Sequence, residues 1–187
     1  MEHQRKPRSL IAFNRCPSLR DICPSRMNKM KRPSFQQAWQ RFSEINVDIS
    51  EVGKKIGGNV NLNIQLGIDD PLQGFTNACA IRMSYTLNYS GFKVERGSWK
   101  TVSGKDKNWY IYRVQDIIKF LTYKFGRPDK TVRNPTPSDF ANDKGVLVFT
   151  VPGWNDASGH VTLWDGKACS DHCYFPKASE ASIWQLK

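Results

Sequence analysis

The spacing of the apolar residues changes along this chain, and that change constrains the fold more than any other feature of the sequence. In the first two thirds, apolar residues recur at helical intervals in four segments, 34–46, 50–56, 78–89 and 114–125. In the last third they form short runs or alternate, as strands do, in 146–151, 160–164, 168–174 and 182–186. Helices followed by a largely antiparallel sheet predict an α+β fold with the N-terminal helices packed on the C-terminal sheet.

Several boundaries are also readable. Ser34 and Gln37 have the spacing of a capping box, so the folded part is expected to begin near residue 34. Residues 57–77 are rich in Gly, Asn and Asp and predict a long loop that leads to Cys79. Trp109–Tyr112 is aromatic and predicts a short strand, whereas residues 127–143 predict a loop.

The positive charge is concentrated at the N-terminus. The chain of 187 residues has a net charge of +11, of which residues 1–33 carry +7 and residues 34–187 only +4. We therefore divide the sequence into a basic leader, 1–33, predicted to be disordered, and one domain, 34–187. The leader lacks the continuous apolar core of a secretory signal. No apolar run reaches the roughly 18 residues of a membrane span.

Cys79 is the first candidate for chemistry, because it falls in the first turn of the predicted helix 78–89. The thiolate is the nucleophilic form of cysteine, and a helix N-terminus favours negative charge. The backbone N–H of Cys79 is a candidate donor to an oxyanion, and the side-chain amide of Asn77 or Gln73 is a candidate second donor. The alternative interpretation is that Cys79 is a small buried apolar residue.

A histidine base for this thiol has to be chosen between His160 and His172, since the remaining histidine lies in the leader. Asp165-Gly166 predicts a two-residue hairpin turn, and its register would place His160 directly opposite Asp171. Opposed residues have Cβ atoms about 5 Å apart, so this carboxylate would orient the imidazole. His172 has the opposite parity, which favours His160. The alternative is a purely structural His–Asp pair.

Cys169 and Cys173 lie on either side of Asp171. In an extended strand their Cα atoms would be about 13 Å apart, whereas a disulfide needs less than about 7 Å. A bridge therefore requires the chain to turn just after Asp171. The competing interpretation is a metal site formed with His172, although no second close pair of ligands is available.

The segments RPSFQQAW, IGGNV, NACAIRMSY, YIYRVQDII, GHVTLWDG and ACSDHC, which together extend from about residue 32 to 173, resemble the fourth family of type VI secretion amidase effectors. These are antibacterial toxins with a papain-like peptidase fold. The resemblance implies hydrolysis of the γ-D-glutamyl–meso-diaminopimelate amide bond of peptidoglycan, with Cys79, His160 and Asp171 as catalytic residues. It also implies a disulfide between Cys169 and Cys173 and no metal or other cofactor.

The resemblance further implies three partners: a peptidoglycan stem peptide as substrate, a cognate immunity protein and a delivery component of the secretion system. The protein would be made in the cytoplasm and injected into the periplasm of a target cell, without a role for nucleic acid or membrane. Two rival interpretations remain at this point. One is a housekeeping cell-wall cysteine endopeptidase, and the other is a nucleic-acid-binding protein, suggested by the charge and the aromatic content.

Overall fold

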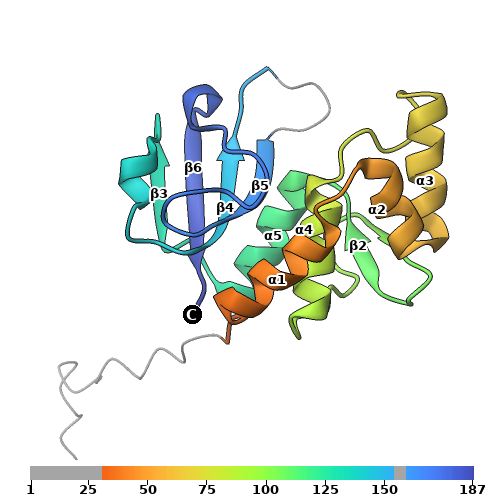
Figure 1. The fold of residues 1–187 in the computed structure, drawn as a ribbon, viewed down its shortest axis with the longest axis horizontal. Coiled ribbons are helices and arrows are strands. Elements are labelled where there is room, and N and C mark those ends of the chain that lie inside the picture. The colour runs from red at the N-terminus through yellow and green to blue at the C-terminus, as the bar shows by residue number, and fades with distance from the viewer. Residues whose placement is uncertain (1–30, 154–158) are drawn as a thin grey trace, which may run out of the picture.

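The computed structural model describes residues 31–153 and 159–187 (Figure 1). The helices are α1 (Phe35–Ile45), α2 (Ile49–Ile56), α3 (Gly58–Asp69), α4 (Cys79–Tyr89) and α5 (Val114–Phe125). The strands are β1 (Thr101–Ser103), β2 (Trp109–Ile111), β3 (Lys130–Arg133), β4 (Gly145–Thr150), β5 (Gly159–Trp164) and β6 (Glu180–Gln185). Two short 3-10 helices, Pro137–Phe140 and Phe175–Lys177, complete the regular structure of these residues.

The main sheet is antiparallel and has the strand order β3-β6-β4-β5. β4 is its apolar centre, paired on one side with β6 and on the other with β5, and its residues are buried from Gly145 to Phe149. A continuous apolar run suits a strand that is covered on both faces. β5 is consequently an edge strand. A separate two-stranded sheet, β1-β2, lies beside the helices.

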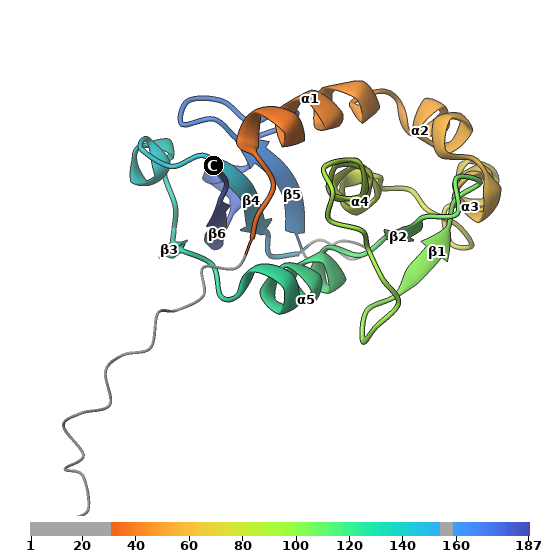
Figure 2. The ribbon, with the colours of Figure 1, turned by 90° about the horizontal axis from the view of Figure 1, so that it is seen from below.

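Three of the helices pack against the main sheet. In Figure 2, α1 and α5 lie on either side of α4, and α4 lies beside β5. One apolar cluster joins these elements, with Phe42 of α1, Met83 of α4, Phe120 of α5 and Val161 of β5 all fully buried. A second cluster joins α2, α3 and α4. The start of α4 is therefore fixed between the helical part of the molecule and the edge of the sheet.

The long loop predicted for residues 57–77 is wrong in its first half, because residues 58–69 form α3. Val60, Ile64 and Gly67 are buried at intervals of four and three residues, and Val60 and Ile64 pack in one apolar cluster with residues of α2. Tertiary packing thus overrides the weak helix propensity of its Gly and Asn residues. Only the remainder, up to Ala78, leads to Cys79 without helical structure, apart from a turn near Leu72.

Three smaller expectations also fail. Residues 127–143 contain β3 and a 3-10 helix in addition to loop. Ser34 precedes α1 but makes no side-chain capping bond, whereas a capping box is present at Thr136 and Asp139. Residues 168–174 form no strand: Cys169 makes one isolated bridge with Trp164, and the chain then leaves the sheet. The expected pairing of His160 with Asp171 in a regular hairpin is therefore wrong.

Most of the predicted leader lies outside the described residues, but its last part contacts the domain. The Arg32 guanidinium forms an ion pair with Asp129 and donates to the backbone carbonyls of Phe125 (2.8 Å) and Gln185 (2.9 Å). Pro33 is buried. Within residues 31–153 and 159–187, no helix is both long enough and apolar enough to cross a bilayer.

Candidate active site

Cys79 is the first residue of α4 and is buried, with 2% of its surface exposed. The preceding loop is fixed to it by Asn77, whose Oδ1 accepts a hydrogen bond from the Cys79 backbone N–H at 2.9 Å. The first turn of a helix leaves its N–H groups without partners inside the helix, so a side-chain oxygen at this place satisfies one of them. The sulfur atom therefore lies at the positive end of a helix whose entry is well defined.

His160 is the second residue of β5. Its Nε2 lies 3.1 Å from Oδ1 of Asp171, and both side chains are almost fully buried, 7% and 6% exposed. The Cys79 side chain lies close enough to the His160 ring to influence its protonation. Since Nε2 is bonded to Asp171, Nδ1 is the ring nitrogen left for the thiol. The structure thus brings Cys79, His160 and Asp171 together.

The surroundings of His160 favour its protonated form. Burial lowers its pKa, but the hydrogen bonds and negative charge of Asp171 and Cys79 outweigh this effect and raise the pKa from 6.5 to about 9. Burial by itself would raise the pKa of the Asp171 carboxyl. The hydrogen bond and charge of His160 and the hydrogen bond of the Thr162 hydroxyl outweigh burial and hold this pKa below its ordinary value. At neutral pH the pair is therefore an imidazolium bonded to a carboxylate.

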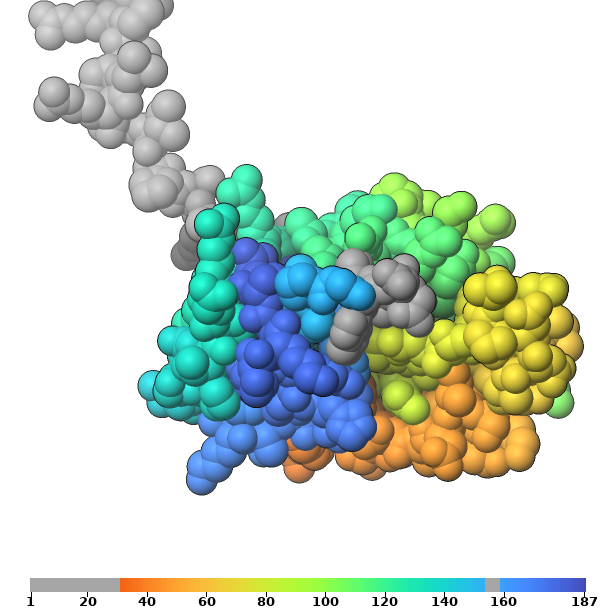
Figure 3. All heavy atoms as spheres, turned by 90° about the horizontal axis from the view of Figure 1, so that it is seen from above, coloured from red at the N-terminus to blue at the C-terminus, as the bar shows by residue number. Residues whose placement is uncertain are grey.

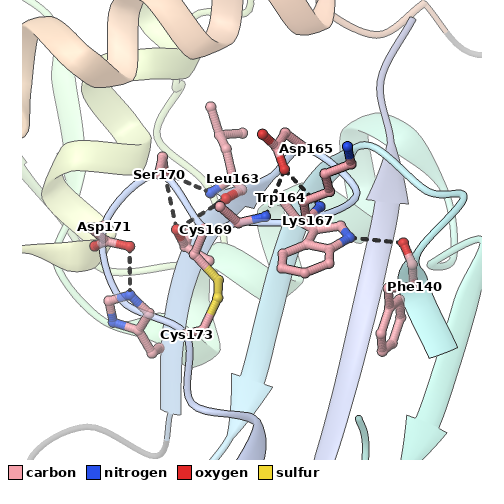
Figure 4. The surroundings of a disulfide bond; sticks show 12 residues. Phe140, Leu163, Trp164, Asp165, Lys167, Cys169, Ser170, Asp171 and Cys173 are labelled. Atoms are coloured by element: carbon pink, nitrogen blue, oxygen red, sulfur yellow. Dashed lines mark hydrogen bonds and ion pairs between the residues drawn. A yellow bond between two sulfur atoms is a disulfide. The ribbon is translucent and has the colours of Figure 1, made fainter. Parts of the chain in front are cut away.

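Asp171 reaches His160 from a turn, not from a strand. The disulfide between Cys169 and Cys173 holds their Cα atoms 5.5 Å apart, so the chain between them curls, with Asp171 in its middle (Figure 4). This bridge confirms the predicted pairing of the two cysteines. It also removes both thiolates from the alternative metal site.

Neighbouring side chains fix the same turn. Ser170 Oγ accepts from the Leu163 backbone N–H (3.1 Å) and bonds the Thr162 hydroxyl (3.0 Å). The Ser170 carbonyl accepts from Asn46 Nδ2, which reaches it from the loop between α1 and α2 at 3.0 Å. Sequence reasoning missed these contacts. Thr162 carried a usable signal, since it lies two residues from His160 and so on the same face of the strand, but Asn46 carried none.

The remaining predicted residues lie as follows. His172 is exposed, and its ring is near Tyr174. Tyr174 also lies against His160, with ring centroids 4.8 Å apart, a contact that the sequence did not predict. Asn77 is adjacent to Cys79, as described above. The Gln73 side-chain amide instead donates to the Asp70 carboxylate at 2.8 Å, so the structure does not bring it to Cys79.

A helix that begins at a buried cysteine and packs on an antiparallel sheet carrying a histidine defines the papain-like fold, and this is the class to which the structure belongs. Residues 75–184 match the family model "Type VI secretion system (T6SS), amidase effector protein 4", Tae4. The chain belongs to this family of amidase effectors. It is accordingly an enzyme of the amidase type, as the resemblance implied.

Solved structures of this family agree with the assignment. The Tae4 effector of Enterobacter cloacae is 48% identical, with a TM-score of 0.78 over 85% of this chain and 99% of that one. The effector–immunity complexes Tae4–Tai4 of Enterobacter cloacae and Salmonella Typhimurium contain chains 47% and 45% identical, each with a TM-score of 0.77 over 84% of this chain and 100% of the other. No curated protein sequence matches the chain.

Proposed function

We propose that this effector hydrolyses the γ-D-glutamyl–meso-diaminopimelate amide bond of peptidoglycan stem peptides, with Cys79 as nucleophile, His160 as general acid and base, and Asp171 as the residue that orients His160. The observation that carries the proposal is the buried His160 ring, whose Nε2 bonds Asp171 and which lies close to the Cys79 side chain. Nucleophilic catalysis by cysteine commonly uses a histidine base beside the thiol and a third group that orients the base.

The first half of the reaction forms a thioester. The Cys79 sulfur, having given its proton to His160, attacks the carbonyl carbon of the γ-glutamyl amide. The C–N bond then breaks, and the His160 imidazolium passes its proton to the departing diaminopimelate amine. A pKa of about 9 keeps His160 protonated until that step at neutral pH.

The second half releases the acyl group. Neutral His160 takes a proton from a water molecule, the hydroxide attacks the thioester carbonyl, and the C–S bond breaks. The sulfur leaves as the thiolate, bonded to the newly formed imidazolium. The products are a peptide ending in D-glutamate and a peptide beginning with diaminopimelate. Besides the substrate and one water molecule, the two half-reactions need no group from outside the chain.

The oxyanion of each tetrahedral intermediate needs donors, and we assign the first to the Cys79 backbone N–H. That N–H donates to Asn77 Oδ1. The oxyanion would replace Asn77 as its acceptor, and the Asn77 Nδ2 group would be the second donor. Gln73 would first have to leave Asp70, so we rank it below Asn77.

We also assign to this chain the biology of its relatives. Their solved complexes contain the immunity protein Tai4. A cognate immunity protein would protect the producing cell, and a component of the secretion system would carry the effector to the periplasm of the target cell. An oxidising periplasm suits the disulfide between Cys169 and Cys173.

The deciding experiment is digestion of purified peptidoglycan fragments, with the new termini identified by mass spectrometry. The wild type should give D-glutamate carboxyl ends and diaminopimelate amino ends, and Cys79→Ala should give neither. Cys169 and Cys173 form the disulfide, so Cys79→Ala removes the one free thiol of the described residues. Cleavage at another amide would correct the assigned bond, and cleavage that persists in Cys79→Ala would refute the assigned nucleophile.

A further inference from the structure

A hollow of about 240 Å³ adjoins the N-terminal end of α4. Residues 71–77 form one side of it, and Tyr112 and Arg113, which connect β2 to α5, form the other. Asn77 belongs to this wall and bonds the backbone of Cys79, so the hollow lies next to the candidate nucleophile. Figure 3 shows the yellow segment that contains α3 and the blue C-terminal part at opposite ends of one face.

Arg113 lies on this wall without a polar partner. Its guanidinium is 5.6 Å from the centre of the Tyr112 ring, and that ring stacks on Phe75 at 4.6 Å. Within residues 31–153 and 159–187, the Arg113 side chain makes no ion pair and no hydrogen bond. Arg32 and Arg41, in contrast, are each paired with a carboxylate. The stacked rings hold the Arg113 group in place while its N–H donors stay available.

The chemistry of the wall selects for an anion. Of the described residues that line the hollow, none is acidic, and the polar ones other than Arg113 are Gln73, Thr76, Asn77 and Tyr112. A guanidinium binds a carboxylate through two parallel hydrogen bonds, which fixes both position and orientation. Placed beside a nucleophile, such a group would position a substrate carboxylate next to the scissile amide.

We propose that Arg113 binds a carboxylate of the stem peptide that flanks the scissile bond and is thereby a specificity-determining residue. This inference rests on the function proposed above. In a γ-D-glutamyl linkage, three carbons separate the α-carboxylate of D-glutamate from the scissile carbonyl. On the other side, the diaminopimelate carboxyl next to the scissile nitrogen is bonded to D-alanine, and the free diaminopimelate carboxylate lies five carbons from that nitrogen, at the far end of the side chain. Both carboxylates are free in the intact stem peptide, and both can be amidated chemically.

Three peptides separate these two sources: L-Ala-γ-D-Glu-meso-diaminopimelate-D-Ala, the same peptide with D-glutamate α-amidated, and the same peptide with the free diaminopimelate carboxylate replaced by a carboxamide. The value of kcat/KM is measured for each with the wild type, Arg113→Gln, Arg113→Lys and Arg96→Gln. Arg96 is the matched control, because it is also exposed and lies over an aromatic ring, that of Trp109 at 4.9 Å, but does not line the hollow.

Arg113→Gln is expected to lower kcat/KM for the unmodified peptide by about 10- to 100-fold, the range for loss of a charged hydrogen-bonded pair. It should have little effect on the peptide whose contacted carboxylate is already an amide, and that peptide identifies the carboxylate. Arg113→Lys should retain part of the activity, since a lysine keeps the charge but not the paired donors. Arg96→Gln should match the wild type.

The possible failures are distinguishable. A wild type that cleaves none of the three peptides would overturn the proposed function and the role of Arg113 with it. A wild type that cleaves all three equally well, together with an Arg113→Gln variant that is unchanged or equally weakened on all three, would overturn only the role of Arg113. Thermal unfolding of each variant shows that the comparison concerns folded protein, and Arg113 is exposed enough for its replacement to be tolerated.

Discussion

Asn46 Nδ2 donates a 3.0 Å hydrogen bond to the backbone carbonyl of Ser170, and so connects the loop between α1 and α2 to the turn that carries Asp171. The two residues are 124 positions apart and belong to different halves of the fold. This bond is exposed, so its contribution to global stability is small, but it restrains the carboxylate that orients His160. We therefore assign Asn46 a positioning role.

Asn46→Ala is expected to lower kcat several-fold while the free energy of unfolding falls by about 1 kcal/mol or less. The matched control is Asn63→Ala, because Asn63 Nδ2 also makes an exposed bond to a backbone carbonyl, that of Asn59, but within α3. Steady-state kinetics and denaturant unfolding of both variants test the assignment. Equal kinetic losses in the two variants would contradict a specific role for Asn46.

The disulfide between Cys169 and Cys173 is expected to stabilise the protein by about 2 kcal/mol. This value is at the low end for a disulfide, because the loss of unfolded-state entropy increases with the length of the closed loop and this loop is very short. Cys169→Ala/Cys173→Ala should lose that much stability and a larger share of its activity, since Asp171 lies between the two cysteines. Urea unfolding and the peptide cleavage assay measure the two effects separately. A variant with full activity would show that the other contacts of Ser170 suffice to hold the turn.

Residues 58–69 form helix α3, although their sequence predicted a loop. Its Gly and Asn residues resemble those of a loop, and the sequence alone favoured that interpretation. The buried positions Val60, Ile64 and Gly67 do follow helical spacing, but the exposed Leu62, 59% accessible, obscured the pattern. The amphipathic helices α1 and α5, in contrast, have charged and polar outer faces and were predicted almost to the residue.

The candidate site was predictable in its residues but not in its geometry. A two-residue turn at Asp165-Gly166 would have paired Trp164 with Lys167, but the Asp165 carboxylate accepts from the backbone N–H groups of Lys167 and Ala168 at 2.7 Å, and Trp164 bridges Cys169. An Asx-type turn of this kind competes with the hairpin register. Asp171 nevertheless lies beside His160, because the disulfide curls the chain there.

The pH dependence of activity should report the His160–Asp171 pair. The folded-state pKa of His160, about 9, lies above its ordinary 6.5, so the imidazolium that protonates the leaving amine is present below pH 9 and is lost as the pH rises through that value. In Asp171→Asn one cause of the raised pKa is absent, and the alkaline limb of kcat/KM should move to lower pH. We also expect kcat to fall by about 100-fold.

NMR titration of the His160 ring in the wild type, in Asp171→Asn and in Cys79→Ala provides the direct measurement. Both variants should show a lower His160 pKa than the wild type, because each removes a neighbouring group that raises this pKa. An alkaline limb that stays in place in Asp171→Asn would contradict the orienting role of Asp171.

The loop that leads to Cys79 is held by backbone contact between two glycines. A Cβ atom added to Gly74 would lie 1.9 Å from the backbone nitrogen of Gly67 in α3 and 2.4 Å from the carbonyl oxygen of Asn63, and neither atom can move independently of the helix. Gly74→Ala should therefore displace the loop, destabilise the fold by about 1–3 kcal/mol and lower kcat/KM, because Asn77 and the wall of the hollow move with it. Leu72→Ala, in the same loop with a side chain 95% exposed, should leave the free energy of unfolding within about 0.5 kcal/mol of the wild type. If Gly74→Ala unfolded at the same urea concentration as Leu72→Ala, the close approach of α3 to this loop would not be what positions residues 74–77.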